Sequence, residues 1–347
     1  MAVCLRLLLI LASVSGAFST AACAGDQPPA ASRNAQLPGF FDRFIDLPHE
    51  YLSSKFVDLA SGVDDFFGND RSFQESNKSV LQFDLTRLYE SNSSGSFVPS
   101  FRAKLHLPGT QDRLHQWLER VHLLLETNPD RNLQGAGAGG IVQQGRGTLF
   151  NEVATPDSYG AALRFENRED SAWRASADTG LKLVNATDVM KLNQTGLDPF
   201  VRTRFSYLYP AGITQLKLTE SLFWFNTVGA GESTQFDADY KISDPLLFRA
   251  TSGATWLHDT QNFDLRQDFS LYQTLNESVS RLYQASVIGV TKPQAQVAEY
   301  VVLMLHRQRI HRDWMFLELS PQLHYPRVNN YQLNAQFIIR LEILFAK

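Results

Sequence analysis

From residue 77 to residue 347 the chain consists of segments of about ten residues in which apolar and polar side chains alternate. The last segment is the clearest. One of its faces carries only Leu333, Ala335, Phe337, Ile339, Leu341, Ile343 and Phe345. The other face carries Asn334, Gln336, Arg340 and Glu342, together with Ile338 and Leu344. Because successive side chains of a strand point to opposite faces, this period of two predicts β-strands with one apolar and one polar face.

Such strands are long enough to cross a membrane at a tilt, which takes about 9–11 residues. Their predicted ranges are 78–90, 97–107, 113–125, 157–167, 172–184, 199–209, 214–226, 234–243, 247–257, 262–273, 278–290, 297–307, 312–325 and 331–345. The segment 113–125 is less regular, and 297–307 has apolar residues on both faces. Short connections alternate with longer ones such as 126–156 and 185–198, as they do in outer-membrane barrels. The predicted fold class is therefore all-β: a transmembrane, antiparallel, up-and-down barrel of about 14 strands with a short N-terminal amphipathic helix.

Alternation alone also fits a soluble β-sandwich, in which the apolar faces pack between two sheets. Two features favour the barrel. The polar faces carry many charges, and aromatic residues such as Tyr209, Trp256 and Phe345 lie near strand ends, as in the aromatic girdles of membrane barrels. Glu220 is the exception, because it falls on the apolar face of 214–226. A charge there is costly against lipid, so we expect a bulge or a slipped register in this strand.

The first 24 residues predict a secretory signal peptide. Arg6 forms a short positive region, residues 7–18 are apolar, and Ala22-Cys23-Ala24 provides a cleavage site. An alternative is that Cys23 is lipidated, because the alanines before it partly fit a lipobox.

Residues 25–76 are predicted to form a leader and an amphipathic helix ahead of the barrel domain at 77–347. Within the helix, at 48–67, apolar residues recur at steps of four and three: Leu52, Phe56, Leu59, Val63 and Phe66. Three placements stay open for it. The helix packs at the mouth of the barrel, plugs its lumen, or binds a partner as a coiled coil.

Composition and motifs exclude several functions. The net charge is −4 and no basic run occurs, which argues against nucleic-acid binding. Only Cys4 and Cys23 are present, so a cysteine-based metal site is excluded. The chain has no P-loop, dinucleotide fingerprint, G-x-S-x-G or H-E-x-x-H motif, and its eight scattered histidines are expected at the surface. We expect no enzyme, no cofactor and no metal. The alternative is a lipid-modifying hydrolase with a Ser or His on the outer belt.

The signal peptide, the alternating strands and a last strand reading NAQFIIRLEILF resemble those of Gram-negative outer-membrane β-barrel proteins. The resemblance covers residues 77–347 and is to the class as a whole. The terminal strand of this class usually ends on its aromatic residue, whereas here Ala346 and Lys347 follow Phe345. The resemblance implies the cell outer membrane as location, after signal-peptide cleavage, with outer-membrane lipid and the barrel-assembly machinery as partners.

The polar faces are where we expect function, since charges that face a lumen need water or one another. The pore-lining candidates are Arg102, Lys104, Arg174, Asp178, Arg202, Arg204, Asp237, Asp239, Lys241 and Arg249. One hypothesis is a weakly selective, porin-like channel for small polar solutes. In it, two arginines (202 and 204) oppose two aspartates (237 and 239) across the lumen and set a transverse field. The other hypothesis is a filled structural or assembly barrel that docks a periplasmic partner through the 48–67 helix.

Overall fold

The structure is a computed structural model that describes residues 79–90, 93–106, 120–127, 129, 158–167, 172–184, 196–226, 229–311 and 314–346. The predicted signal peptide, the leader, the 48–67 helix and most of the 126–156 connection lie outside the described residues. Among the described residues, no helix has the length and hydropathy needed to cross a membrane.

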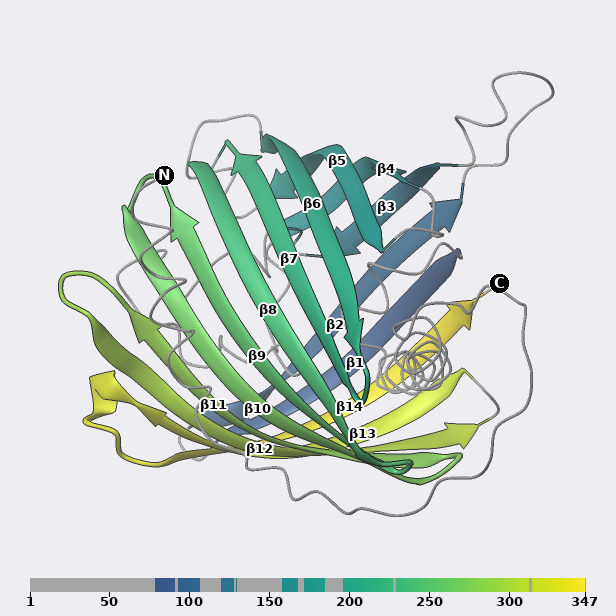
Figure 1. The fold of residues 1–347 in the computed structure, drawn as a ribbon, viewed down its shortest axis with the longest axis vertical. Coiled ribbons are helices and arrows are strands. Elements are labelled where there is room, and N and C mark those ends of the chain that lie inside the picture. The colour runs from purple at the N-terminus through teal and green to yellow at the C-terminus, as the bar shows by residue number, and fades with distance from the viewer. Residues whose placement is uncertain are drawn as a thin grey trace, which may run out of the picture.

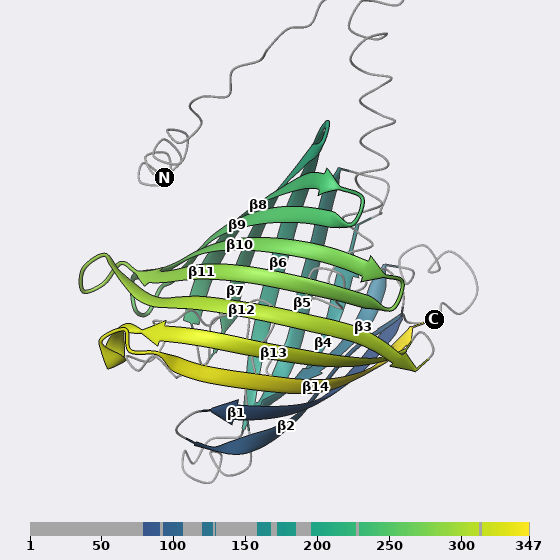
Figure 2. The ribbon, with the colours of Figure 1, turned by 90° about the horizontal axis from the view of Figure 1, so that it is seen from below.

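The strands form one closed antiparallel barrel in which each strand pairs with its neighbours in the chain and the first pairs with the last (Figure 1). Figure 2 shows the yellow β14 beside the blue β1, where the barrel closes. The strands are β1 Val80–Glu90, β2 Ser93–His106, β3 Val121–Thr127, β4 Ser158–Glu166, β5 Trp173–Val184, β6 Leu197–Ala211, β7 Thr214–Phe225, β8 Gly229–Ser243, β9 Leu246–Leu257, β10 Asn262–Asn276, β11 Val279–Val290, β12 Gln296–His311, β13 Met315–Pro326 and β14 Asn334–Ala346; a short 3-10 helix, η3 (Arg327–Asn329), precedes β14. The predicted 14-strand antiparallel all-β barrel is confirmed.

The strand bounds differ from the predicted ones mainly at the ends. β12 continues to residue 311 instead of 307, because Gln308 and Arg309 still pair with Leu317 and Phe316 of β13. A run of polar side chains is therefore not a sign that the strand has ended at this rim of the barrel. The largest difference is β3, which begins at Val121 where the sequence predicts 113. Residues 107–119 lie outside the described part of the chain.

Two-residue turns join β6 to β7, β8 to β9 and β10 to β11 at one end of the barrel. Gly212 and Ile213 connect β6 to β7, and Gly212 has a φ of +67°, which glycine adopts without steric cost. Between β8 and β9, Asp244 accepts a hydrogen bond from Lys241 Nζ at 2.7 Å. This hydrogen bond lowers the pKa of the exposed Asp244 carboxyl below its ordinary value. The connections 128–157 and 185–196 join strands at the opposite end.

Apolar and charged residues take places opposite to those in a water-soluble protein. The outward face exposes large apolar side chains, among them Trp173 at 60% and Phe205 at 48%. The inward face buries charged ones: Arg164 is 1% exposed, and Lys104 and Arg307 are 0% exposed. Since a sandwich would bury its apolar faces between two sheets, the sandwich alternative is wrong for this closed single sheet.

Glu220 lies on the outward face, as the alternation predicts, but the expected bulge or slipped register is wrong. β7 pairs with β6 and β8 in unbroken register along its whole length. Glu220 is held instead by a side-chain contact, because Thr234 Oγ1 on the neighbouring strand donates to its carboxylate at 2.7 Å. A cross-strand hydroxyl thus accommodates the carboxylate without distorting the backbone.

Gly180 on β5 provides a test of the packing between β4 and β5. A Cβ built there would lie 2.4 Å from the Ala161 carbonyl oxygen and 2.6 Å from the Ala162 Cβ. We expect Gly180→Ala to lower the free energy of unfolding by about 1–3 kcal/mol, because overpacking forces the strands apart. Gly253→Ala is the control, since its Cβ would meet only Arg266 Cβ, at 4.0 Å. Urea unfolding in lipid vesicles, followed by tryptophan fluorescence, measures both. Equal midpoints would contradict this packing.

Candidate functional site on the inward face of the barrel

The ten charged residues predicted from the sequence all lie on the face of the sheet opposite to the exposed apolar side chains. They lie on β2 (Arg102, Lys104), β5 (Arg174, Asp178), β6 (Arg202, Arg204), β8 (Asp237, Asp239, Lys241) and β9 (Arg249). Five of them are buried: Lys104, Asp178, Asp237, Asp239 and Arg249. Buried charges at these positions need partners on the same face of the sheet.

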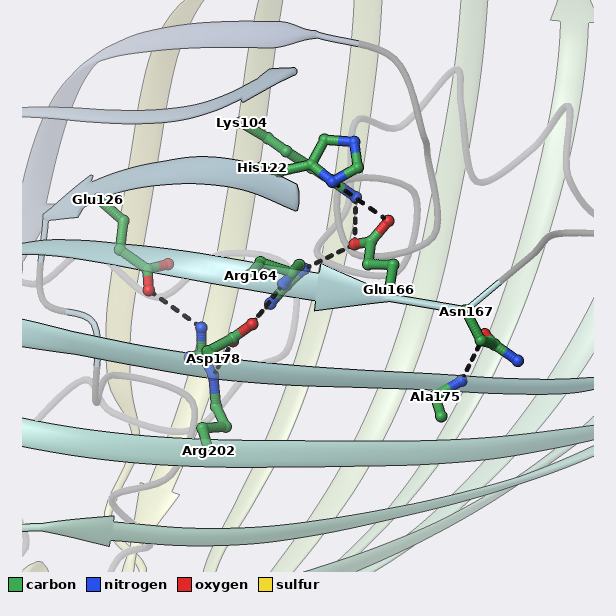
Figure 3. A network of polar contacts seen from close by, with 9 residues as sticks. All are labelled: Lys104, His122, Glu126, Arg164, Glu166, Asn167, Ala175, Asp178 and Arg202. Atoms are coloured by element: carbon green, nitrogen blue, oxygen red, sulfur yellow. Dashed lines mark hydrogen bonds and ion pairs between the residues drawn. The ribbon is translucent and has the colours of Figure 1, made fainter. Parts of the chain in front are cut away.

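One carboxylate, Glu166 at the end of β4, collects three basic neighbours (Figure 3). Lys104 Nζ lies 2.5 Å from its Oε1, and Arg164 Nη1 lies 3.6 Å from the same oxygen. His122 Nδ1 is 3.9 Å from Oε2. These groups come from β2, β3 and β4, so three consecutive strands are tied together on the inward side.

A second carboxylate, Asp178 of β5, binds two arginines. Arg164 donates from Nε and Nη2 at 2.6 and 2.8 Å, a bidentate pair. Arg202 Nε donates to Oδ2 at 2.8 Å, and its Nη2 reaches Glu126 Oε1 on β3 at 3.2 Å (Figure 3). Together with the pair between β2 and β4, this network of β2–β6 contains as many carboxylates as lysines and arginines, so its charges balance.

Arg202 also holds the first part of the long connection after β3. Its Nη1 donates to the Pro129 carbonyl oxygen at 3.1 Å. Pro129 is buried, and a Cβ at Gly160 of β4 would lie 2.8 Å from Pro129 Cγ. Gly160 therefore leaves the space that Pro129 fills on the inward face. Pro129, at the start of the 126–156 connection, thus lies on the inward face; most of the connection lies outside the described residues.

Arg307 on β12 organises the opposite part of the wall. Its guanidinium donates to Glu318 Oε1 at 2.5 Å and to both oxygens of Glu342 at 2.5 and 3.0 Å. It also lies 4.0 Å from the Phe316 ring centroid. Arg340 Nη1 is 3.4 Å from the other oxygen of Glu318. The sequence prediction missed Arg307 because the segment 297–307 has apolar residues on both faces, so its inward face was not identified. The spacing from the inward Leu305 was the available signal.

A third set of contacts joins β8 to β9. Arg249 Nε and Nη2 bind the two oxygens of Asp239 at 2.6 and 2.9 Å, and the guanidinium lies 5.3 Å from the Tyr272 ring centroid. Asp237 accepts from Thr251 Oγ1 at 2.7 Å. Both aspartates are thus bound by the neighbouring strand.

The predicted opposed ladders do not match these positions. β6 and β8 both pair with β7, so the arginines at 202 and 204 and the aspartates at 237 and 239 lie on the same wall. Arg202 binds carboxylates of β3 and β5, and Asp239 binds an arginine of β9. The strand register therefore pairs these charges with side chains on nearby strands of the same wall. It does not place the two arginines and the two aspartates on opposite sides of the lumen.

Two histidines lie inside the barrel, contrary to the surface placement expected for all eight. His122 is 2% exposed and His324 is 3% exposed. His324 Nδ1 lies 2.8 Å from Glu299 Oε1, and its Nε2 lies 2.9 Å from Gln322 Oε1. Within the described ranges, no group of three or more His, Cys, Asp or Glu residues is arranged to hold a metal ion.

An apolar cluster interrupts the polar inward face near the end with the longer connections. The rings of Phe200 and Phe225 stack with centroids 4.8 Å apart, and Phe223 meets Phe225 edge-on at 6.3 Å. Leu257 belongs to the same buried cluster. A Cβ at Gly231 would lie 2.3 Å from Phe223, so glycine leaves room for that ring. The polar-face prediction did not anticipate this cluster.

No protein-family model matches the chain, and no curated protein sequence matches it either. Among solved structures, the outer-membrane channel DcaP of Acinetobacter baumannii is similar over 77% of this chain and 96% of that chain, with 8% identity and a TM-score of 0.42. A loop-deletion mutant of OmpT from Vibrio cholerae is similar over 77% and 98%, with 10% identity and a TM-score of 0.43. A bacterial polysaccharide outer membrane secretin is similar over 78% and 99%, with 11% identity and a TM-score of 0.43. At TM-scores below 0.5 these likenesses add no weight to the fold, which rests on the strand pairing.

The Arg307 cluster gives a stability prediction. We expect Arg307→Met to lower the free energy of unfolding by about 3–5 kcal/mol. The change removes the guanidinium that binds the buried Glu342 and leaves the buried Glu318 with the 3.4 Å contact to Arg340. Lys241→Met is the control: Lys241 pairs with Asp244, whose side chain is 92% exposed in the turn after β8. It should cost about 1 kcal/mol or less. Urea midpoints of the folded barrels in vesicles measure both losses. A loss for Arg307→Met no larger than the control's would contradict the cluster's role.

Proposed function

We propose that this protein is a porin-like channel of the cell outer membrane. The observation that carries the proposal is the inverted distribution of side chains, apolar outward and charged inward, around a closed sheet. An exposed apolar belt is unfavourable in water, whereas the outward face of a barrel in a bilayer is apolar. A closed barrel also leaves no unpaired strand edge in the hydrocarbon, which is a condition for spanning it with strands. Outer-membrane lipid and the barrel-assembly machinery are the partners that this location implies.

Strand number supports a lumen wide enough for solutes. Side chains fill barrels of about eight strands, and barrels of about sixteen hold an aqueous channel, so fourteen strands lie near the second case. The inward start of the 128–157 connection, at Pro129, narrows that lumen. Because the ion pairs of the wall balance locally, we propose weak charge selectivity and small polar solutes as cargo.

A second candidate is a filled structural or assembly barrel that docks a periplasmic partner through the 48–67 helix. The burial of inward charges favours it, since Arg164 and Arg307 are 1% exposed or less. In both proposals the protein is not an enzyme and does not bind nucleic acid. Neither proposal includes a cofactor.

Planar-bilayer recording of the full processed chain separates the two candidates. We expect ohmic openings with nearly equal permeability for cations and anions. Arg202→Ala should increase the conductance and shift the reversal potential toward cations, because it removes one of the two arginines on Asp178 and the donors to Glu126 and the Pro129 carbonyl. Arg281→Ala is the matched control: it removes an arginine from the outward face, beside His306, and should leave selectivity unchanged.

Silence from a correctly folded barrel would contradict the channel and support the filled barrel. Heat-modifiable mobility on gels verifies folding before the recording. A folded Arg202→Ala channel with unaltered selectivity and conductance would contradict the proposed role of the β2–β6 network in ion permeation.

A further inference from the structure

The outward face of β7–β10 carries five polar side chains in mid-strand, among apolar ones such as Leu218, Phe236 and Phe269. Its polar side chains are Glu220 on β7, Glu232 and Thr234 on β8, Ser252 on β9 and Gln267 on β10. By contrast, the outward face of β14 carries only Ala335, Phe337, Ile339, Leu341, Ile343 and Phe345. Lipid can contact the apolar face of β14, whereas the polar side chains of β7–β10 are costly against lipid and favour contact with another protein surface.

Glu220 indicates that the contacting surface supplies a hydrogen-bond donor. Its Oε2 accepts from Thr234, while its Oε1 has no hydrogen-bond partner among the described residues and is covered by the chain itself in a single copy. The next outward residues of β7, Leu218 and Leu222, are each 47% exposed, so the carboxylate lies within an apolar belt. A polar group in hydrocarbon is stabilised by a donor from a neighbouring protein surface.

The same face supplies a candidate donor on its other side. Gln267 Oε1 accepts from Ser252 Oγ at 2.5 Å, while its amide nitrogen makes only a long contact, 3.3 Å, to the Asp268 carbonyl oxygen. That NH2 group has a further hydrogen to donate. A carboxylate on β7 and an amide on β10 thus form complementary halves of one surface.

Their positions suit a two-fold axis along the membrane normal. Glu220 lies five residues from the end of β7 at Phe225 (225 − 220), and Gln267 lies five residues from the start of β10 at Asn262 (267 − 262). Both strand ends belong to the same rim of the barrel. An axis through β8 and β9 therefore brings Glu220 of one copy opposite Gln267 of the other, twice in one interface.

Small residues flank the proposed axis. Thr234 pairs with Ala254, and Ala238 pairs with Ala250, across β8 and β9 on the outward side. Phe236, 41% exposed, lies between them opposite Ser252. Small residues let two backbones come together in a membrane, where packing and hydrogen bonds drive association.

We propose that the outward face of β7–β10 is the interface of a homodimer, with a second copy of this chain as its occupant. In this dimer the Glu220 side chain turns outward, and its carboxylate accepts a hydrogen bond from Gln267 of the other copy, twice in one interface. The proposal rests on the membrane placement proposed above and goes beyond the channel function, since each barrel keeps its own lumen.

Disulfide trapping in native membranes tests it. The variant carries Glu220→Cys and Gln267→Cys in the full chain, whose only other cysteines, Cys4 and Cys23, lie in the predicted signal peptide. Within one chain the two positions are three strand spacings apart, about 14 Å at about 4.8 Å each, beyond the reach of a disulfide. A disulfide between them therefore joins two chains. The matched control places cysteines at Ala285 on β11 and Ile339 on β14, also outward and three strands apart.

We expect a band of twice the monomer mass on non-reducing gels for the first pair and none for the control pair. Equal bands for both pairs, no band from a heat-modifiable barrel, or a band of another mass would each overturn the dimer; the last would identify a different partner. A folded monomer in the outer membrane overturns the dimer alone. Recovery of the protein in the soluble periplasm overturns the proposed function with it.

Glu220→Leu provides a second readout that a purely structural role would not move. We expect it to weaken dimerisation in detergent at least about tenfold, measured by native mass spectrometry, while the barrel stays folded. Leu323→Ala on β13, an outward residue far from this face, is the control and should leave dimerisation unchanged. A Glu220→Leu variant that dimerises as well as the parent would overturn the assignment of the Glu220–Gln267 contact.

Discussion

The pairing of β1 with β14 is the contact on which the rest of the barrel depends. It runs without interruption from Val80 opposite Ala346 to Glu90 opposite Gln336. If it were absent, both strands would present unpaired backbone groups, each of which costs several kcal/mol in hydrocarbon. Closure also gives the sheet an inside and an outside. The period-two pattern of every strand is thereby converted into a radial separation of charged and apolar side chains.

That separation creates a difficulty on the inward side, where many charges face one another. Ion pairs between nearby strands neutralise these charges: Asp178 binds two arginines, Asp239 binds Arg249, and Arg307 binds two glutamates. Each ion pair links the strands that carry its two side chains.

The sequence predicts which face a residue occupies, because a strand alternates strictly, and this was sufficient for the strand number and the inward placement of all ten candidates. It does not predict which side chains meet. Arg307 binds Glu342, 35 residues away, because β13 places β12 and β14 on its two sides. The opposed ladders were wrong for the same reason, since adjacency to β7 puts β6 and β8 on one wall. Glu220 kept its outward position because a hydroxyl from β8 was available, which alternation alone cannot reveal.

We infer that the apolar faces of the strands contact lipid and that the polar faces line the interior of the barrel. Nitroxide labels placed singly along β14, from Ala335 to Ile343, test it in lipid vesicles. We expect collision with oxygen, which concentrates in lipid, to peak at 335, 337, 339, 341 and 343 and to fall at the residues between them. High collision of the same odd positions with a water-soluble nickel complex, or no period of two, would contradict it.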